Sequence, residues 1–326
     1  MNRRLFVRTV GVSVLAAAST AARTQTATRL RRIGYLSLGD DALAERDSVL
    51  VPLRALGWIE LQNLLIERRF ANGKEELLQP FAEKLVRLDV DLVVTNGTAA
   101  ALAVKRASPT VFIVMYSAGD PVASGLVASL AHPGGNVTGN SNVSKELTVK
   151  RLELVRELLP GATRVAELVN PTDPIFRNTR VETEQAYRSL GLQPMFVDVA
   201  TASEVDNAIS EAARKRAQVL IVQTYSFFGT NRYEIIRAAF GHALPTVGDT
   251  QYMLQAGALL TYTLSLTERG RRTAAFIDKI LRGTKPAEIP VEQPSQFELG
   301  VNLRSAKTLG IRVPQSLLIR ADEIIE

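Results

Sequence analysis

The sequence predicts an α/β protein built from two lobes, each with a parallel β-sheet covered by helices. Short apolar runs alternate with segments whose apolar residues recur every three or four positions, which is typical of strands followed by helices. This alternation occurs in two successive series, and a chain of 326 residues is long enough for one large or two ordinary domains. Two α/β lobes in tandem enclose a cleft, so we expect the functional site between them.

The first series ends with the segment from Tyr116 to Gly139. Asp120-Pro121 has the form of a helix start, and Gly134-Gly135 has the form of a turn into the next strand. Strands alternating with helices predict a parallel, Rossmann-like sheet. We expect strands at 33–37, 64–70, 92–95, 111–115 and 136–139, and helices at about 41–56, 77–88, 98–107 and 121–130.

The second series repeats this plan with a different sequence. We expect strands at 164–169, 195–199, 219–224, 245–248 and 258–262, and helices at about 145–159, 176–190, 204–216 and 231–240. The last part of the chain does not continue this alternation. Its sequence predicts a helix at 268–281, a proline-rich segment at 285–294, a strand at 297–303 and a short last helix.

Residues 1–25 have the features of an export signal that is cleaved from the mature protein. Met1 to Arg8 is basic, 10–18 is apolar but too short to span a bilayer, and small residues follow. Arg3-Arg4 and the residues after it resemble a twin-arginine signal, and both this route and the general secretory route stay open. We therefore expect a periplasmic protein.

Composition excludes several classes of site and partner. The sequence has no cysteine, so a disulfide, a thiol nucleophile and a lipid-attachment cysteine are excluded. Arg3, Arg4 and Arg8 lie at the start of the export segment, and subtracting them from the net charge of +6 leaves +3, so no nucleic-acid partner is expected. With two histidines, no phosphate-binding loop and no nucleophile-elbow motif, we expect neither an enzyme nor a cofactor or metal.

Polar and aromatic residues gather at the carboxyl ends of the predicted strands, the edge where open parallel sheets bind ligands. A cleft lined by aromatic rings and a few polar groups is the usual form of a small-molecule site. Tyrosines also occupy half-buried strand ends without any ligand, so that alternative stays open. The candidate ligand-binding residues are Ser37, Asn96, Gly97, Thr98, Tyr116, Ser117, Asn170, Thr224, Tyr225, Phe227, Asp249 and Tyr252.

Two of these candidates suggest a specific chemistry. Asn96-Gly97-Thr98 joins a strand to a helix, where backbone N–H groups and the helix dipole favour a carboxylate. Asp249 follows an apolar strand in the second series and could pair with a ligand ammonium group. The alternative for Asn96 and Thr98 is that they cap the helix. Asp120 and Asp173 are expected to be structural, at a helix start and a turn.

Several motifs resemble one known family. They include Gly119-Asp120-Pro121-Val122, Gly125 to Leu130, Pro133 to Gly139 and Arg320-Ala321-Asp322-Glu323. These resemble the signature of periplasmic solute-binding proteins of ABC transporters, whose best-known members bind tryptophan and tyrosine. The resemblance, which covers about 31–326, implies a type I periplasmic binding protein with a hinge that the chain crosses several times. The implied lobes are 29–141 with 267–287, and 142–266 with 288–326.

The resemblance also implies a ligand and a partner. The first expected ligand is an aromatic amino acid, while an aromatic carboxylate without an amine or a nucleoside-like molecule stays open. The expected partner is an ABC permease in the inner membrane, and the protein is expected to be a monomer. The alternatives are a cytosolic two-lobed α/β enzyme, such as a sugar-nucleotide transferase, and the effector domain of a regulator, for which residues 1–30 are too short and apolar.

Overall fold

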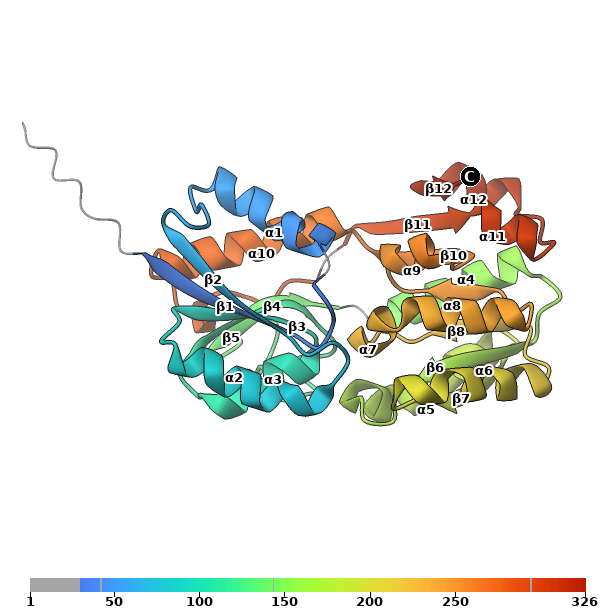
Figure 1. Ribbon diagram of the computed structural model, residues 1–326, viewed down its shortest axis with the longest axis horizontal. Helices are drawn as coiled ribbons and strands as arrows, with labels where there is room; N and C mark the ends of the chain where they lie inside the picture. The colour runs from blue at the N-terminus through green and yellow to red at the C-terminus, as the bar shows by residue number, and fades with distance from the viewer. Residues whose placement is uncertain (1–29, 42, 143, 294) are drawn as a thin grey trace, which may run out of the picture.

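The computed structural model describes residues 30–41, 43–142, 144–293 and 295–326, and within them the chain forms two α/β lobes side by side (Figure 1). The predicted export signal lies outside the described residues. Each lobe has its own sheet with helices on both faces, as the alternating pattern predicts. No helix in the described ranges is long and apolar enough to cross a membrane.

The N-terminal sheet has five strands within the described residues, in the order β2-β1-β3-β4-β5, and all neighbouring pairs are parallel. Its strands are β1 (Arg31–Ser37), β2 (Leu64–Phe70), β3 (Leu92–Asn96), β4 (Phe112–Ala118) and β5 (Val137–Ser141). Its helices are α1 (Leu43–Ala55), η1 (Glu75–Leu77), α2 (Leu78–Arg87) and α3 (Thr98–Ala107). Buried alanines such as Ala100 and Ala103 let α3 pack closely against this sheet.

The C-terminal sheet has seven strands in the described part of the chain, in the order β12-β11-β10-β9-β8-β6-β7. Its strands are β6 (Arg164–Val169), β7 (Gln193–Asp198), β8 (Val219–Val222), β9 (Thr246–Gly248), β10 (Leu260–Leu264), β11 (Phe297–Asn302) and β12 (Glu323–Ile325). Its helices are α4 (Ser144–Leu158), α5 (Pro174–Ser189), η2 (Ala202–Glu204), α6 (Val205–Arg214), α7 (Ser226–Thr230), α8 (Arg232–Gly241), α9 (Gln251–Ala256), α11 (Leu303–Thr308) and α12 (Gln315–Arg320). Strand β11 is antiparallel to β10, whereas the other neighbours are parallel.

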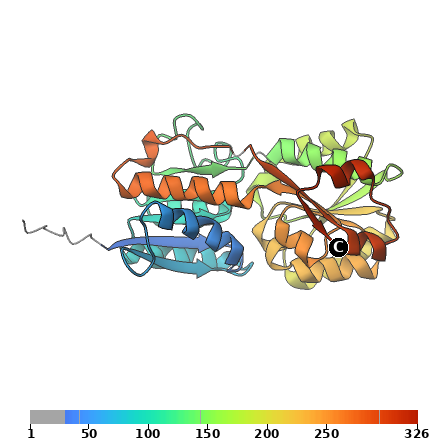
Figure 2. The same ribbon diagram turned by 90° about the horizontal axis from the view of Figure 1, so that it is seen from above.

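Helix α10 (Leu266–Leu281) follows the last parallel strand of the C-terminal sheet but packs on the N-terminal one, alongside α1 (Figure 2). The approach to α1 is close, since a Cβ on Gly270 would lie 2.1 Å from the backbone oxygen of Ser48. After η3 (Pro286–Glu288) the chain returns to the C-terminal lobe as β11. Among the described elements, the chain therefore crosses between its lobes from β5 to α4, from β10 to α10 and from η3 to β11.

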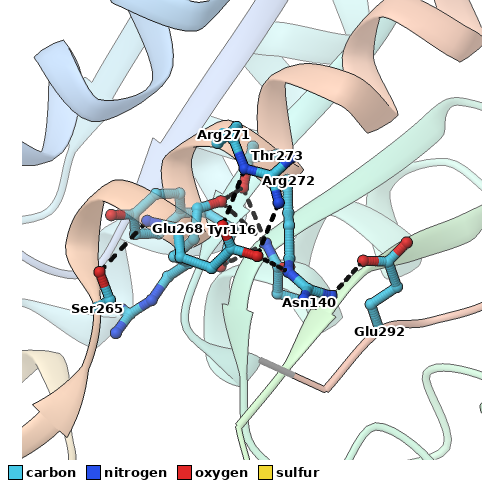
Figure 3. Close-up of polar contacts among 9 residues, drawn as sticks. Tyr116, Asn140, Ser265, Glu268, Arg271, Arg272, Thr273 and Glu292 are labelled. Carbon is cyan, nitrogen blue, oxygen red and sulfur yellow. Dashed lines mark hydrogen bonds and ion pairs between the residues drawn. The ribbon is translucent and has the colours of Figure 1, made fainter. Parts of the chain in front are cut away.

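Polar contacts tie these crossing segments together (Figure 3). The side-chain amide of Asn140 donates to the hydroxyl of Thr273 at 2.9 Å. Arg272 on α10 pairs with Glu268 on the same helix at 2.6 Å and with Glu292 in the third crossing at 2.5 Å. Several segments that cross between two lobes side by side restrict where the lobes can bend. These crossings therefore mark the hinge region.

One expected helix is wrong. Residues 121–125 form turns instead, although Asp120 accepts hydrogen bonds from the backbone of Val122 at 3.0 Å and of Ala123 at 2.9 Å, as an N-cap does. Gly125 has a positive φ of 73°, and Leu126 donates back to the oxygen of Pro121, so the chain closes after one turn. The structural role expected for Asp120 is confirmed. Helices α7, α9 and α11 are too short for a periodic pattern and were not expected.

Candidate ligand-binding site

A cavity of about 190 Å³ lies between the lobes, at the carboxyl ends of strands from both sheets. Asn96 ends β3, Ser117 lies near the end of β4, and Asp249 directly follows β9. Open parallel sheets bind ligands at this edge because helix N-termini and loop side chains converge there. The cavity lining includes eight of the predicted residues: Asn96, Gly97, Thr98, Ser117, Thr224, Tyr225, Asp249 and Tyr252.

Four predicted residues do not line the cavity, and each has a structural contact. The hydroxyl of Ser37 accepts a hydrogen bond from the backbone of Gly39, and Asn170 accepts from the backbone of Thr172 at 2.8 Å. Both side chains therefore hold turns at strand ends. Sequence position alone does not separate such turns from ligand contacts, because the same polar residues serve both purposes.

The other two are large rings within the core. Tyr116 is fully buried beneath α10, with the guanidinium of Arg269 5.3 Å from its ring. Phe227 packs edge to face on Phe228 with ring centroids 5.4 Å apart. Both rings were expected at or just after strand ends, but Tyr116 lies within β4, and both side chains are buried in apolar clusters.

On the N-terminal side, the start of α3 faces the cavity. Gly97 has a positive φ of 95° and offers no side chain to cap the helix, and Thr98 and Ala99 line the cavity. The N–H of Gly97 already donates to the oxygen of Ser117 at 2.8 Å, and the hydroxyl of Thr98 accepts from Gly119. The positive end of the helix dipole therefore acts on the cavity, while these two groups hold the loop.

On the C-terminal side, two charged residues meet over Thr224. Arg151 on α4 donates from its Nη1 to the hydroxyl of Thr224 at 3.0 Å and from its Nε to the oxygen of Tyr262 at 3.0 Å. The Thr224 hydroxyl in turn bonds to the carboxyl of Asp249. Burial raises the pKa of Asp249 and lowers that of Arg151, and the attraction between the two charges opposes both shifts.

A second buried acid, Glu167 on β6, lies beyond Arg151. It is 6% exposed and accepts a hydrogen bond from the hydroxyl of Tyr187 on α5 at 2.6 Å. Burial raises the pKa of Glu167 to about 7, although the Tyr187 hydrogen bond and the charge of Arg151 favour the ionised form. Burial also raises the pKa of the Tyr187 hydroxyl, and the nearby Glu167 adds to that effect.

The raised pKa of Glu167 predicts that the free energy of unfolding falls as pH rises. The unfolded carboxyl ionises near pH 4.5, whereas the folded one keeps its proton up to about pH 7. The folded state therefore binds more protons in this window, and roughly 3 kcal/mol of stability is lost as pH rises from 5 to 8. Urea denaturation at several pH values should show this slope in the wild type and a flatter one in Glu167→Gln. Parallel slopes would contradict the assignment, and Glu184→Gln on the exposed side of α5 is the control.

The described residues contain no group of three or more His, Cys, Asp and Glu side chains that could hold a metal ion. The cavity instead combines a helix start on one lobe with buried charges on the other. Such a site can bind a zwitterionic small molecule without any covalent chemistry.

Known proteins that are similar to this chain also bind small molecules. Residues 37–325 match the family model of the ABC transporter substrate binding proteins. The chain belongs to this family. This is a family of solute-binding proteins, which favours the binding function over the two-lobed enzyme considered from the sequence. A small-molecule ligand and an ABC permease are the partners of a substrate-binding protein.

Individual relatives share the fold along most of the chain. The tyrosine-binding protein of Clostridioides difficile is 26% identical over 260 residues, which cover 78% of this chain and 73% of the relative. A conserved domain protein from Vibrio cholerae has a TM-score of 0.85 at 25% identity, covering 91% of this chain and 100% of that one. A Streptococcus pneumonia structure in complex with L-Trp has a TM-score of 0.83 at 22% identity, covering 90% and 99%.

Three cavity residues of this substrate-binding protein were not predicted from its sequence, namely Arg151, Glu167 and Arg269. The predicted residues follow strand ends, whereas these three lie within α4, β6 and α10. A signal was present for two of them. Glu167 interrupts an apolar run from Val165 to Val169, and Arg151 shares a helix face with Leu147 and Val155. A lone charge on a buried face needs a partner, so it marks a network or a site.

Proposed function

We propose that this substrate-binding protein is exported, closes its two lobes on an aromatic amino acid in the periplasm, and presents it to an ABC permease. The main support for this ligand class is that the N-terminus of α3 and Asp249 line the same cavity. The first favours a carboxylate and the second an ammonium group, so together they match a zwitterion. The name of the Clostridioides difficile relative supports an aromatic side chain.

The proposal includes an organisation of the chain. We take residues 1–25 as the cleaved signal, 29–141 with 267–287 as the N-terminal lobe and 142–266 with 288–326 as the C-terminal lobe. The protein would act as a monomer, since each chain carries both sides of its cavity. Ligand binding shifts such a protein to its closed form only through contacts that both lobes make.

Contacts across the cleft indicate what stabilises closure. Arg232 on α8 pairs with Asp40, in the loop after β1, at 3.0 Å. Glu75 in η1 accepts hydrogen bonds from the hydroxyls of Thr172 at 2.8 Å and Tyr225 at 3.3 Å. These contacts exist only while the lobes are together, so they favour the closed arrangement in addition to any ligand.

Arg232→Ala should weaken ligand binding because it removes an ion pair that joins the two lobes. A partly exposed ion pair contributes about 0.2–1 kcal/mol, so the affinity for the bound amino acid should fall by up to about fivefold. Arg237→Ala is the matched control, because Arg237 lies on the same helix but pairs with Asp206 within its own lobe. Calorimetric titration of both variants measures the difference, and equal affinities would rule out a contribution to closure.

The ligand class is tested by titrating the purified protein with L-tryptophan, L-tyrosine, aromatic carboxylates without an amine, nucleosides and sugars. A ligand at a hundred times its Kd adds about 2.7 kcal/mol of stability, which raises Tm by several degrees. A response to the aromatic amino acids is expected. A response to sugars or nucleosides only would overturn the ligand class while leaving the family membership intact.

A further inference from the structure

The cavity continues from the cleft into the C-terminal lobe, where it forms an inner chamber between α4, α5 and the sheet. One face of α5 lines it with Phe176, Thr179, Thr183 and Tyr187, which recur at helical spacing. Leu152 on α4 lines the opposite side. The walls are thus largely apolar and aromatic with hydroxyl groups between, and a flat ring with a polar end would fit such a space.

Glu167 lies on the wall of this inner chamber. It is a carboxylate on a strand whose neighbouring positions, Val165 and Val169, are fully buried and apolar. Tyr187 donates to Oε2, which uses one of the acceptor positions of the carboxylate. A carboxylate has about four such positions, so Glu167 can accept a further hydrogen bond from a donor in the chamber.

Of the two buried acids, Glu167 interacts less strongly with nearby positive charges than Asp249 does. Asp249 attracts Arg151 more strongly than Glu167 does, and Arg269 also acts on Asp249. A buried acid with an incomplete set of partners is costly unless a donor reaches it. A bound ligand can supply that donor.

We infer that the inner chamber selects ligands whose side chain ends in a hydrogen-bond donor, and that Glu167 is the acceptor that recognises it. This inference rests on the proposed function. The charged groups of an amino acid held between α3 and Asp249 leave its side chain to extend past Arg151 towards Glu167. A phenol hydroxyl or an indole N–H meets the requirement, whereas a phenyl ring does not.

A ligand whose ring carries no hydrogen-bond donor should bind more weakly than one with a donor, because it leaves Glu167 without a further hydrogen bond. A site built to bind a hydroxyl or N–H group discriminates strongly against the analogue that lacks it. At pH 8, where Glu167 is ionised, a hydrogen bond to this buried carboxylate is expected to change affinity by about tenfold or more. L-Phenylalanine should therefore bind at least about tenfold more weakly than L-tyrosine or L-tryptophan.

The test is calorimetric titration of the full chain at pH 8 with L-tyrosine, L-tryptophan and L-phenylalanine, in the wild type and in Glu167→Leu. The variant should lose at least about tenfold in affinity for tyrosine and tryptophan and should bind phenylalanine at least as well as the wild type. Glu184→Leu, the same change on the exposed side of α5, should leave all three affinities unchanged. Glu167→Met, which keeps the unbranched shape of the side chain but has no oxygen to accept the hydrogen bond, serves if the leucine variant does not fold.

The outcomes separate this inference from the proposed function. Equal wild-type affinities for the three amino acids would overturn the role of the inner chamber and leave the proposed function standing. The role of the inner chamber would also be overturned if Glu167→Leu, or Glu167→Met in its place, kept the preference of the wild type. Binding of none of the three would overturn both proposals.

Discussion

Arg151→Met should destabilise the protein more than any other single change in the buried charge network. The methionine fills similar space but leaves Asp249 and Glu167 buried without the cation between them. It also removes donors from the Thr224 hydroxyl and the oxygen of Tyr262. Removing one partner of a buried ion pair costs about 3–5 kcal/mol because the remaining charge stays desolvated.

Urea denaturation of the ligand-free protein at pH 8 and pH 5 measures this loss. The deficit should be larger at pH 8, where Glu167 is ionised in the wild type, than at pH 5, where it is protonated. Arg156→Met is the control, since Arg156 lies on the exposed side of the same helix and should change stability by less than about 0.5 kcal/mol. A deficit below about 1 kcal/mol at pH 8 would contradict a structural role for Arg151.

Asp249→Asn should weaken amino-acid binding by about 30-fold or more. The side chain is 7% exposed and lines the cavity, so its charge acts on a ligand ammonium through little water. Removing one member of a buried, hydrogen-bonded charge pair at an interface costs about 2 kcal/mol or more in affinity. The loss should appear with L-tyrosine but not with its analogue that lacks the amine, because that analogue offers Asp249 no cation.

Calorimetric titration with both compounds separates a role in binding from a general effect on the fold. Asp206→Asn, on the exposed surface of the same lobe, should leave both affinities as they are in the wild type. An equal loss for both compounds would assign Asp249 to the structure of the cavity. Unchanged affinity for tyrosine would place the ammonium site elsewhere.

The two series of strands and helices could be predicted from sequence because each element carries its own periodic pattern. Strand β3 and helix α3 match the expected ranges to within a residue, and the joint between them, Asn96-Gly97-Thr98, lies in the cavity. The helix expected at 121–130 does not form. Asp120-Pro121 has the form of a helix start, but Gly125 adopts a positive φ and ends the first turn.

The candidate site was predictable where a residue follows a strand and points to the cleft, as Asp249 and Thr224 do. Tyr116 and Phe227 were expected at strand ends as well, but Tyr116 lies within β4 and both side chains are buried in the core. Whether a ring at a strand end faces solvent or the interior depends on what packs above it. In this protein α10, which comes about 150 residues later, covers Tyr116.

The fold class, the two series and the edge at which a ligand could bind are readable from the sequence, because they follow from local periodicity and the shared direction of parallel strands. The places of Arg151 and Glu167 in the cavity, and the contact of Asp40 with Arg232 across it, depend on the folded structure. Those contacts join residues that are far apart in the chain. They depend on how helices pack on the sheets and how the lobes approach each other, which no local pattern specifies.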